Sequence, residues 1–404
     1  MVNINAIYCG DCLKILQGFP SESVDLIYLD PPFFSNKHYE VIWGNHAEKR
    51  SFGDRWEGGI MHYINWMRDR LEQCHRVLKK TGSIYLHCDY HASHQLKVMM
   101  DKVFGENNFI NEIIWHYRKW TAGEKLFQRN HDVILFYSKS KNYVFNTQYQ
   151  PLSAETIKRW KGKKQVATFE DSGKRNPGQS LKEDSKGVPM ADVWVDINII
   201  APSAKERLGY PTQKPEGLLD RIIKVSSNEG DLVLDPFVGG GTTIAVAQKL
   251  NRNWIGIDVS PTACKVAEKR LKNLGIKDIA ILGLPTSIKE LESLPHFEFQ
   301  NWVCKQLNGR SSDKKSGDMG IDGNTSNGIP IQVKQSQGIG RNVIDNFETA
   351  IRRADKEKGI IVGFSFVKGA IEEVARIKDS EGVIIKLLTI SEMLKADFNP
   401  NELF

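Results

Sequence analysis

The sequence predicts an α/β protein, with a parallel sheet within residues 1–285 and a smaller α/β unit within residues 290–404. Residues 24–29 form an apolar run that ends at an acid, Asp30. Residues 232–258 contain a strand pattern, a glycine-rich turn, a helical segment and a second strand pattern, an order typical of parallel sheets. Residues 329–334 alternate apolar and polar side chains, which indicates a further strand in the smaller unit.

The loop after the first apolar run carries Asp30, Pro31, Pro32 and Phe33. A buried parallel strand would deliver Asp30 to the carboxyl edge of the sheet, where open α/β sheets bind ligands. The prolines fix the backbone and leave its carbonyl groups free to accept hydrogen bonds. A carboxylate, a carbonyl and a flat apolar face suit the exocyclic amino group of a nucleobase, whose two hydrogens need acceptors. The alternative is a strand that simply ends in a proline turn.

A second loop follows residues 232–234 and has the features of an adenosyl-binding unit. Its glycines let a ligand approach the backbone, and an acid about 20 residues further on can bind ribose hydroxyls. Ile244 stands where the dinucleotide fingerprint has a third glycine, so a nicotinamide cofactor is disfavoured. The candidate residues of this second site are Asp235, Phe237, Gly239, Gly241, Thr242 and Asp258.

Together these segments resemble the β class of amino-directed DNA methyltransferases, in which the catalytic motif precedes the cofactor motif. Asp11 is similar to the family's adenine-contacting acid, and Lys214 and Pro215 lie in a segment similar to the one that leads into the cofactor helix. Residues 83–89 and 111–115 also look like family strands. Between them, residues 91–103 have the pattern of an amphipathic helix with Leu96, Val98, Met99 and Val103 on its apolar face. The resemblance, which covers roughly residues 3–285, implies a Rossmann-like sheet and S-adenosylmethionine (SAM) as the cofactor.

The same resemblance implies the target base. In the family an Asp at the head of the catalytic motif goes with N6-adenine and a Ser with N4-cytosine, so Asp30 favours adenine. Phe33 replaces the commoner Tyr, which leaves N4-cytosine as the alternative. We expect a flipped base, because the amino group is shielded within the duplex. Asp30 and the Pro31 carbonyl would hold the N6 hydrogens. Phe33 would face the base, with Tyr39 or Trp43 as a second aromatic partner.

Basic residues gather between the two motifs, within residues 140–210, where the resembling family carries its target-recognition region. The net charge of the chain is +6. The basic side chains are Lys158, Arg159, Lys161, Lys163, Lys164, Lys174, Arg175, Lys182 and Lys186. They would neutralise phosphates of double-stranded DNA, while Trp160 and Phe169 would stack on or wedge near bases. A solvated insertion without a ligand is the alternative.

The C-terminal segment predicts a different chemistry. Hard oxygen ligands beside a lysine suit Mg²⁺-assisted hydrolysis of a phosphodiester. The segment resembles the Mrr-like branch of the restriction-endonuclease fold over roughly residues 296–392, and residues 362–366 look like a later strand of that branch. By that resemblance Asp322 and Gln332 hold Mg²⁺ and Lys334 orients the attacking water, with Glu298 as an additional acid. A degenerate unit that only binds DNA, or a hairpin with incidental polar residues, are the alternatives.

Composition and the N-terminal residues indicate the cellular location of the protein. No apolar run approaches the about 20 residues of a membrane span, and the N-terminus has no basic region followed by an apolar stretch. We therefore expect a cytoplasmic protein, in which the six scattered cysteines stay as thiols. Family habit suggests a homodimer. The whole chain is interpreted as an adenine methyltransferase fused to a nuclease unit, as in restriction and modification; a non-catalytic DNA-binding protein, or methylation of RNA or protein, are the other hypotheses.

Overall fold

The computed structural model describes residues 2–34, 38–43, 48–53, 58–119, 125–166, 169–174, 179–208, 212–312, 320–395 and 397–404, with the backbone alone for 38–43, 48–53, 179, 180 and 182. Its main body is built on a nine-stranded sheet. In spatial order the strands are β12 (Val193–Trp194), β6 (Phe109–His116), β7 (His131–Ser138), β5 (Leu78–Cys88), β2 (Val24–Leu29), β13 (Leu232–Asp235), β14 (Asn253–Asp258), β1 (Ala6–Cys9) and β15 (Ala280–Leu282).

The central strands of this sheet are parallel and buried on both faces, as their apolar sequences predicted. β2 pairs with β5 and β13, and β14 pairs with β13 and β1, all in parallel. β7 runs antiparallel to both β5 and β6. The strands predicted at residues 24–29 and 253–258 are confirmed to the residue. The mixed α/β sheet that the sequence predicted is therefore present.

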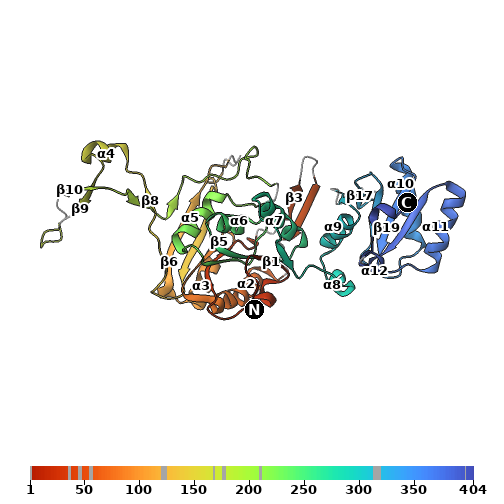
Figure 1. Cartoon of the computed structure of the whole chain (residues 1–404), viewed down its shortest axis with the longest axis horizontal. Helices are drawn as coiled ribbons and strands as arrows, with labels where there is room; N and C mark the ends of the chain where they lie inside the picture. Colours follow the sequence, from red (N-terminus) through yellow and green to blue (C-terminus); the bar gives the residue numbers. More distant parts are fainter. Residues whose placement is uncertain are drawn as a thin grey trace.

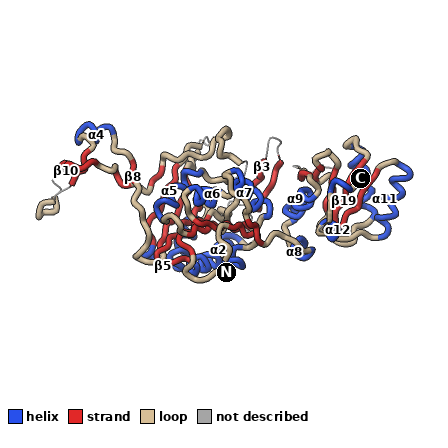
Figure 2. The backbone as a smooth tube through the Cα atoms, in the orientation of Figure 1, coloured by secondary structure: helices blue, strands red, loops and turns tan. Residues whose placement is uncertain are grey.

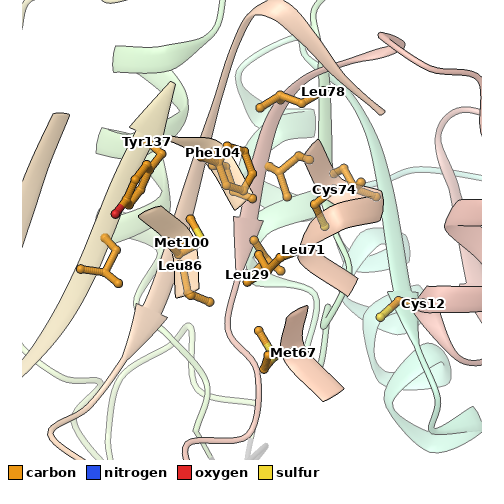
Figure 3. Packing of buried hydrophobic residues seen from close by; sticks show 14 of the residues in the cluster. Cys12, Leu29, Met67, Leu71, Cys74, Leu78, Leu86, Met100, Phe104 and Tyr137 are labelled. Atoms are coloured by element: carbon orange, nitrogen blue, oxygen red, sulfur yellow. The ribbon is translucent and has the colours of Figure 1, made fainter. Parts of the chain in front are cut away.

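Helices cover both faces of the sheet (Figure 1). One face packs on α1 (Cys12–Gln17), α2 (Gly59–Val77) and α3 (Ser93–Phe104), whose apolar side chains form a core with Leu29 and Leu86 (Figure 3). The other face packs on α5 (Glu216–Ser226), α6 (Thr242–Lys249) and α7 (Pro261–Asn273). A short 3₁₀ helix, η1 (Glu106–Asn108), links α3 to β6.

An arm projects from the main body between β7 and β12 (Figure 1). It contains α4 (Ala154–Trp160) and two small antiparallel pairs, β9 (Lys163–Val166) with β10 (Gln179–Asp184), and β8 (Tyr149–Gln150) with β11 (Val188–Pro189). Another pair, β3 (His38–Trp43) with β4 (Glu48–Gly53), follows the first loop. The arm leaves the large sheet after β7 and returns to it as β12, which pairs with β6 at the edge of the sheet.

Residues beyond β15 form a second α/β unit with its own five-stranded sheet (Figure 2). Its strands, in spatial order, are β16 (Gly309–Ser311), β17 (Gly323–Thr325), β18 (Pro330–Val333), β19 (Lys358–Gly363) and β20 (Ile384–Thr389). Its helices are α8 (Ile288–Glu292), α9 (His296–Gln306), α10 (Arg341–Arg353), α11 (Lys368–Glu381), α12 (Ile390–Met393) and the 3₁₀ helix η2 (Pro400–Glu402). Two apolar clusters, one on each face of this sheet, form its core.

Two local predictions were wrong. The strand predicted at residues 362–366 is β19, which runs from Lys358 to Gly363, and the chain after it leaves the sheet and meets Ile339 only through an isolated bridge at Phe366. Val98, predicted on the buried face of its helix, is 56% exposed, because Leu96 and Met99 take the inward positions of α3. Among the described residues no helix is both long and apolar enough to cross a membrane.

Candidate active site

The acids predicted from the two sequence motifs meet at one edge of the large sheet. Asp235 and Asp258 end β13 and β14, and Asp30 directly follows β2, the parallel neighbour of β13. β1 pairs with β14, so Asp11, which follows β1 closely, lies at the same edge. Parallel strands present their carboxyl ends together, and this is the position at which open α/β sheets bind ligands.

Asp30 is paired with Lys214, a residue far from it in sequence. The Lys214 Nζ lies 2.7 Å from Oδ1 and 2.6 Å from Oδ2 of Asp30. The two side chains are largely buried, with exposed fractions of 9% for Lys214 and 17% for Asp30. A carboxylate has about four lone-pair positions, so this pair leaves acceptor positions on Asp30 for another donor. Lys214, predicted among the cofactor residues, thus contacts the Asp-Pro-Pro-Phe loop (residues 30–33).

Phe33 packs against a buried chain of hydrogen bonds. Its ring centroid lies 5.6 Å from that of His87, and the Lys214 Nζ lies 4.9 Å from the Phe33 centroid. The fully buried His87 bonds the Tyr28 hydroxyl through Nδ1 at 2.8 Å and the Asp132 carboxylate through Nε2 at 3.1 Å. Burial acts to raise the pKa of Asp132, but the hydrogen bond with His87 leaves that pKa below its usual value. This chain crosses β2, β5 and β7 and holds the surface behind Phe33 in place.

The glycine-rich loop contacts Asp258 through a main-chain hydrogen bond. Gly239 and Gly241 have φ angles of 47° and 77°, in the left-handed region that favours glycine. The Gly239 N–H donates to Asp258 Oδ2 at 2.9 Å, and the Ser260 N–H donates to Oδ1 at 2.9 Å. A side chain at Gly241 would bring its Cβ to 2.9 Å from the Cβ of Ala267 in α7. The close approach of loop and helix therefore depends on glycine at this position.

Asp235 lies deeper than Asp258. It accepts hydrogen bonds from the Phe237 N–H at 3.0 Å and from the Thr243 hydroxyl. Burial raises the pKa of Asp235 to about 7, and burial likewise raises the pKa of Asp258 to about 6. Asp235 therefore fixes the start of the glycine-rich loop, while Asp258 is the acid that the loop surrounds.

Asp11 caps α1 and pairs with an arginine that the sequence analysis did not single out. Its Oδ1 accepts from the Leu13 N–H at 3.0 Å and from Arg70 at 2.8 Å. The Arg70 guanidinium lies 3.8 Å from the centroid of the Trp66 ring, and that ring lies 5.8 Å from the ring of Phe237. Asp11 and Phe237 are therefore linked through two side chains of α2, whose positions no local sequence pattern indicates.

The remaining predicted residues position helices at this edge. Pro215 is the N-cap residue of α5, directly after Lys214. Thr242 begins α6, and its hydroxyl accepts a hydrogen bond from Arg270 at 2.9 Å. Arg270 also bonds Glu216, the first residue of α5, at 2.9 Å. Thr242 is therefore part of a buried polar contact between α5, α6 and α7.

Comparison with known proteins shows the family of the chain. The N6/N4 DNA methylase model matches residues 24–269, more than half of the chain. The chain belongs to this family. It is 30% identical over 315 residues to the type II methyltransferase M.BamHI of Bacillus amyloliquefaciens, a match that covers 72% of this chain and 64% of that protein. It is 33% identical over 264 residues to the DNA adenine methyltransferase YhdJ of Escherichia coli K12, covering 65% of this chain and 81% of YhdJ. The solved PvuII DNA methyltransferase, described as cytosine-N4-specific, has a TM-score of 0.45 at 17% identity and covers 67% of this chain and 87% of that one.

In this N6/N4 methylase the C-terminal unit carries a second group of predicted site residues. Asp322 precedes β17, and its Oδ2 accepts from the Val333 N–H of β18 at 2.7 Å. Gln332 in β18 is only 3% exposed, and its Oε1 has no hydrogen-bond partner in the described part of the chain. Lys334 stands two positions after Gln332, the spacing that puts side chains on one face of a strand. The structure therefore brings Asp322 to β18, the strand that carries Gln332 and ends directly before Lys334.

Glu298, the additional acid predicted for that group, contacts the methylase part of the chain. The Ser260 hydroxyl donates to its Oε1 at 2.7 Å. Over the described ranges no group of three or more His, Cys, Asp or Glu side chains is placed to hold a metal ion. Gly317, Asp318 and Met319, which precede Asp322 in the predicted motif, lie outside the described residues.

Some predictions fall on parts of the chain that are not described. Tyr39 and Trp43 lie in β3, of which only the backbone is described, and Arg175 and the Lys182 side chain lie outside the described residues as well. Of the other basic side chains in the arm, Lys163 and Lys164 pair with Asp184 and Glu183 across the hairpin at 2.7 and 3.4 Å. Phe169 is 66% exposed.

Proposed function

We propose that the chain transfers a methyl group from SAM to the N6 amino group of adenine in double-stranded DNA at a specific sequence. The observation that carries the proposal is the meeting of Asp30, Asp235 and Asp258 at one sheet edge, with Phe33 beside Asp30. Family membership supports it. The name of the relative YhdJ, an adenine methyltransferase, supports the choice of adenine over cytosine.

The residues at the glycine-rich loop fit SAM. Asp258 offers carboxylate oxygens to ribose hydroxyls, and Gly239 and Gly241 let the backbone approach the ligand. Phe237 and Trp66 offer ring faces nearby. Asp11 contributes through Arg70, Asp235 and Thr242 shape the loop and its helix, and Lys214 and Pro215 set the start of α5. When bound, SAM supplies an electrophilic methyl group.

The Asp-Pro-Pro-Phe loop acts on the base. Asp30 and the Pro31 carbonyl accept the two N6 hydrogens, which draws the nitrogen lone pair out of the ring and makes it nucleophilic. Phe33, held in place by His87, stacks on the flipped base. Asp30 would take the proton that the amino nitrogen loses when the methyl group passes from the SAM sulfur to N6, which leaves the sulfur as the neutral thioether of S-adenosylhomocysteine. Flipping costs a few kcal/mol, which stacking and hydrogen bonds in the site offset.

The arm is the DNA-contacting element in this proposal. The arm, with α4, extends away from the sheet (Figure 1). Its exposed side chains Lys158, Arg159 and Lys174 would neutralise phosphates. Replacing these three by alanine should weaken DNA binding and reduce the salt dependence by about 0.9 in log–log slope for each phosphate that is no longer neutralised. Replacing the paired Lys163 serves as the control. Equal affinity and equal slope for the triple variant would contradict the assignment.

The first test uses purified full-length protein, unmethylated plasmid and SAM, followed by nucleoside analysis and single-molecule mapping of modified bases. N6-methyladenine at one short motif is the expected result. N4-methylcytosine would overturn the base assignment and keep the site. RNA and protein incubated in parallel with labelled SAM test the other amino acceptors, and methyl transfer to neither DNA, RNA nor protein would favour a non-catalytic DNA-binding protein.

We further propose that residues 290–404 form a Mrr-like nuclease unit joined to a methylase domain at residues 1–285. The unpartnered Gln332 Oε1 supports this, because buried oxygen atoms without hydrogen bonds are uncommon and suit a hard cation. The Asp322 carboxylate is bonded to the main-chain N–H of Val333, the residue that follows Gln332 in the same strand. Asp322 and Gln332 would hold Mg²⁺, whose charge polarises a phosphate, and Lys334 orients water. A DNA-binding unit without catalysis is the alternative.

Incubation of DNA with Mg²⁺ and with wild type or Lys334→Ala decides between them. Cutting by wild type that Mg²⁺ supports and Lys334→Ala lacks is the expected result. The substrates should include plasmid methylated by the protein itself and unmethylated plasmid, since restriction–modification predicts cutting of the unmethylated DNA alone. Selective cutting of methylated DNA would reverse that logic, and no cutting of any substrate would leave a DNA-binding role.

A further inference from the structure

Helix α9 of the C-terminal unit packs on α7, a helix that covers the large sheet. The contact includes a short hydrogen bond from the Ser260 hydroxyl to Glu298 Oε1, 2.7 Å long. Glu298 was expected to face Asp322 and Gln332 as an extra acid. Its carboxylate is instead committed to a residue next to the glycine-rich loop.

Ser260 connects this contact to the predicted ribose acid. Its N–H donates to Asp258 Oδ1 at 2.9 Å, and its hydroxyl also caps α7 by accepting from the Ala263 N–H at 3.1 Å. The second oxygen of Asp258 is fixed by Gly239. Glu298 therefore holds Ser260 through its hydroxyl, and the main-chain N–H groups of Ser260 and Gly239 hold the Asp258 carboxylate.

The other oxygen of Glu298 indicates that this arrangement is kept at a cost. Oε2 is buried and has no hydrogen-bond partner within the described ranges. Leaving a buried acceptor unpaired is unfavourable, and more so for a charged group. Burial raises the pKa of Asp258, and the nearby charge of Glu298 raises it further. The charge of Glu298 therefore does not stabilise the ionised form of Asp258, and its hydrogen bond to Ser260 favours a role in positioning the site.

We propose that Glu298 is a positioning residue for the cofactor site, through which the C-terminal unit sets the affinity of the methylase sheet for SAM. The inference rests on the proposed function, in which Asp258 binds the ribose of SAM. Glu298 acts through Ser260 and touches neither base nor methyl group, so the transfer step at saturating SAM does not depend on it.

The test measures SAM binding to the full chain by titration calorimetry at pH 8 and at pH 6. At pH 8 Asp258 is ionised, and Glu298→Ala should weaken SAM binding about five- to tenfold because Ser260 loses its acceptor. Glu298→Gln keeps an oxygen acceptor for Ser260 and should bind within about twofold of wild type. Glu292→Gln, an exposed acid of the same unit, is the control.

At pH 6 the SAM affinities of wild type and Glu298→Gln should differ. Glu298→Gln removes a negative charge near Asp258, so this carboxyl ionises more readily and the variant should bind SAM more tightly than wild type. The other titratable groups that act on or with Asp258 are Asp235, Cys12 and Cys264. The hydrogen bond with Cys9, together with burial, raises the pKa of the Cys264 thiol, and burial raises that of Cys12, so both thiols stay neutral over this range. Asp235 is the same in all variants.

A third measurement separates positioning from general stability. In a Ser260→Ala background, Glu298→Ala should cause little further loss of SAM affinity, because the residue acts through the missing hydroxyl. Methyl transfer at saturating SAM should stay within about twofold of wild type for Glu298→Ala. Unchanged SAM affinity of Glu298→Ala at pH 8 would overturn the inference.

If Glu298→Ala fails to fold, absence of the tighter binding by Glu298→Gln at pH 6 overturns the inference equally. Failure of the proposed function itself looks different. Wild type would then bind no SAM at either pH, and both proposals would fall together.

Discussion

The two candidate sites differ in how their polar groups are satisfied. At the edge of the large sheet, Lys214 pairs with Asp30, and main-chain N–H groups bond Asp235 and Asp258. In the C-terminal unit the buried Gln332 oxygen has no partner among the described residues. Fixed donors preorganise acceptors for a neutral or cationic organic ligand, whereas an unpartnered oxygen is suited to a metal ion that supplies the missing interaction. The comparison therefore predicts different responses to substitution at the two sites.

The largest effect is expected at Asp30. Asp30→Ala removes an acceptor for the amino hydrogens and for the released proton, so methyl transfer should fall by about a thousandfold or more. SAM affinity should stay within a few fold, because Asp258 and the glycine-rich loop are intact. Labelled-methyl transfer and titration calorimetry measure the two quantities separately. Methylation at a rate near that of wild type would refute the role of Asp30.

Lys214 sharpens the comparison, because it supplies Asp30 with a buried partner, whereas the buried Gln332 oxygen has none within the described ranges. Lys214→Met keeps the length of the side chain and removes the ammonium, so kcat should fall about ten- to a hundredfold while SAM affinity changes little. In an Asp30→Asn background the same change should cost almost nothing further, since the two residues act as a unit.

Two controls bracket this prediction. Lys224→Met on α5 breaks an exposed pair with Asp220 and should leave kcat unchanged. Lys214→Arg tests whether charge alone suffices. A variant that loses SAM binding but keeps kcat at saturating SAM would make Lys214 a cofactor ligand, as the sequence motif suggested.

The C-terminal group offers a matched pair of buried glutamines. Gln300 Nε2 donates to the Asp322 carbonyl at 2.6 Å, so Gln300→Met should destabilise that unit by about 1–3 kcal/mol. Gln332→Met removes an oxygen without a partner and should be neutral or stabilising by about 1 kcal/mol in the absence of metal. Urea unfolding in EDTA measures both changes. Adding Mg²⁺ should stabilise wild type and not Gln332→Met, and equal losses from the two substitutions would remove the distinction.

The smallest expected effect is the pH dependence of the large-sheet edge. Burial raises the pKa of Asp235 from 3.8 to about 7. Between those values the folded chain holds a proton that the unfolded chain has released, so this group favours folding at low pH and that contribution is lost as the pH rises through 7. The free energy of unfolding of Asp235→Asn, relative to that of wild type, should therefore rise as the pH increases from 5 to 8. Denaturant unfolding across that range measures it, with the exposed Asp220→Asn as the control, and parallel curves for the two variants would contradict the burial effect.

The sequence predicted the strands well where one physical cause dominates. Residues 24–29 and 253–258 are apolar runs closed by turn residues, and burial on both faces leaves them no other arrangement. The acids at their ends could be predicted for the same reason, since a parallel sheet brings carboxyl ends together.

Contacts between segments distant in sequence could not be predicted in this way. The Asp30–Lys214 pair, the Tyr28–His87–Asp132 chain and the Ser260–Glu298 bond each join residues whose local patterns carry no mark of the partner. The wrong strand at residues 362–366 has a similar cause. Its apolar residues are read equally well as strand or as loop, and pairing of Lys358–Gly363 with β18 and β20 decides the register.

The anchoring of the arm has an evolutionary consequence. The chain leaves the sheet after β7, where Asn146 bonds the end of α5, and returns as β12 beside β6, where the Ile114 N–H bonds the Asp192 carbonyl at 2.9 Å. The described residues of the arm between these two attachments lie outside the packed layers of the sheet (Figure 1). An arm of another sequence could therefore be exchanged at the same two attachments without disturbing Asp30 or the glycine-rich loop. If the arm contacts DNA as we propose, descendants of one methylase would acquire new DNA targets by such an exchange while their chemistry is inherited unchanged.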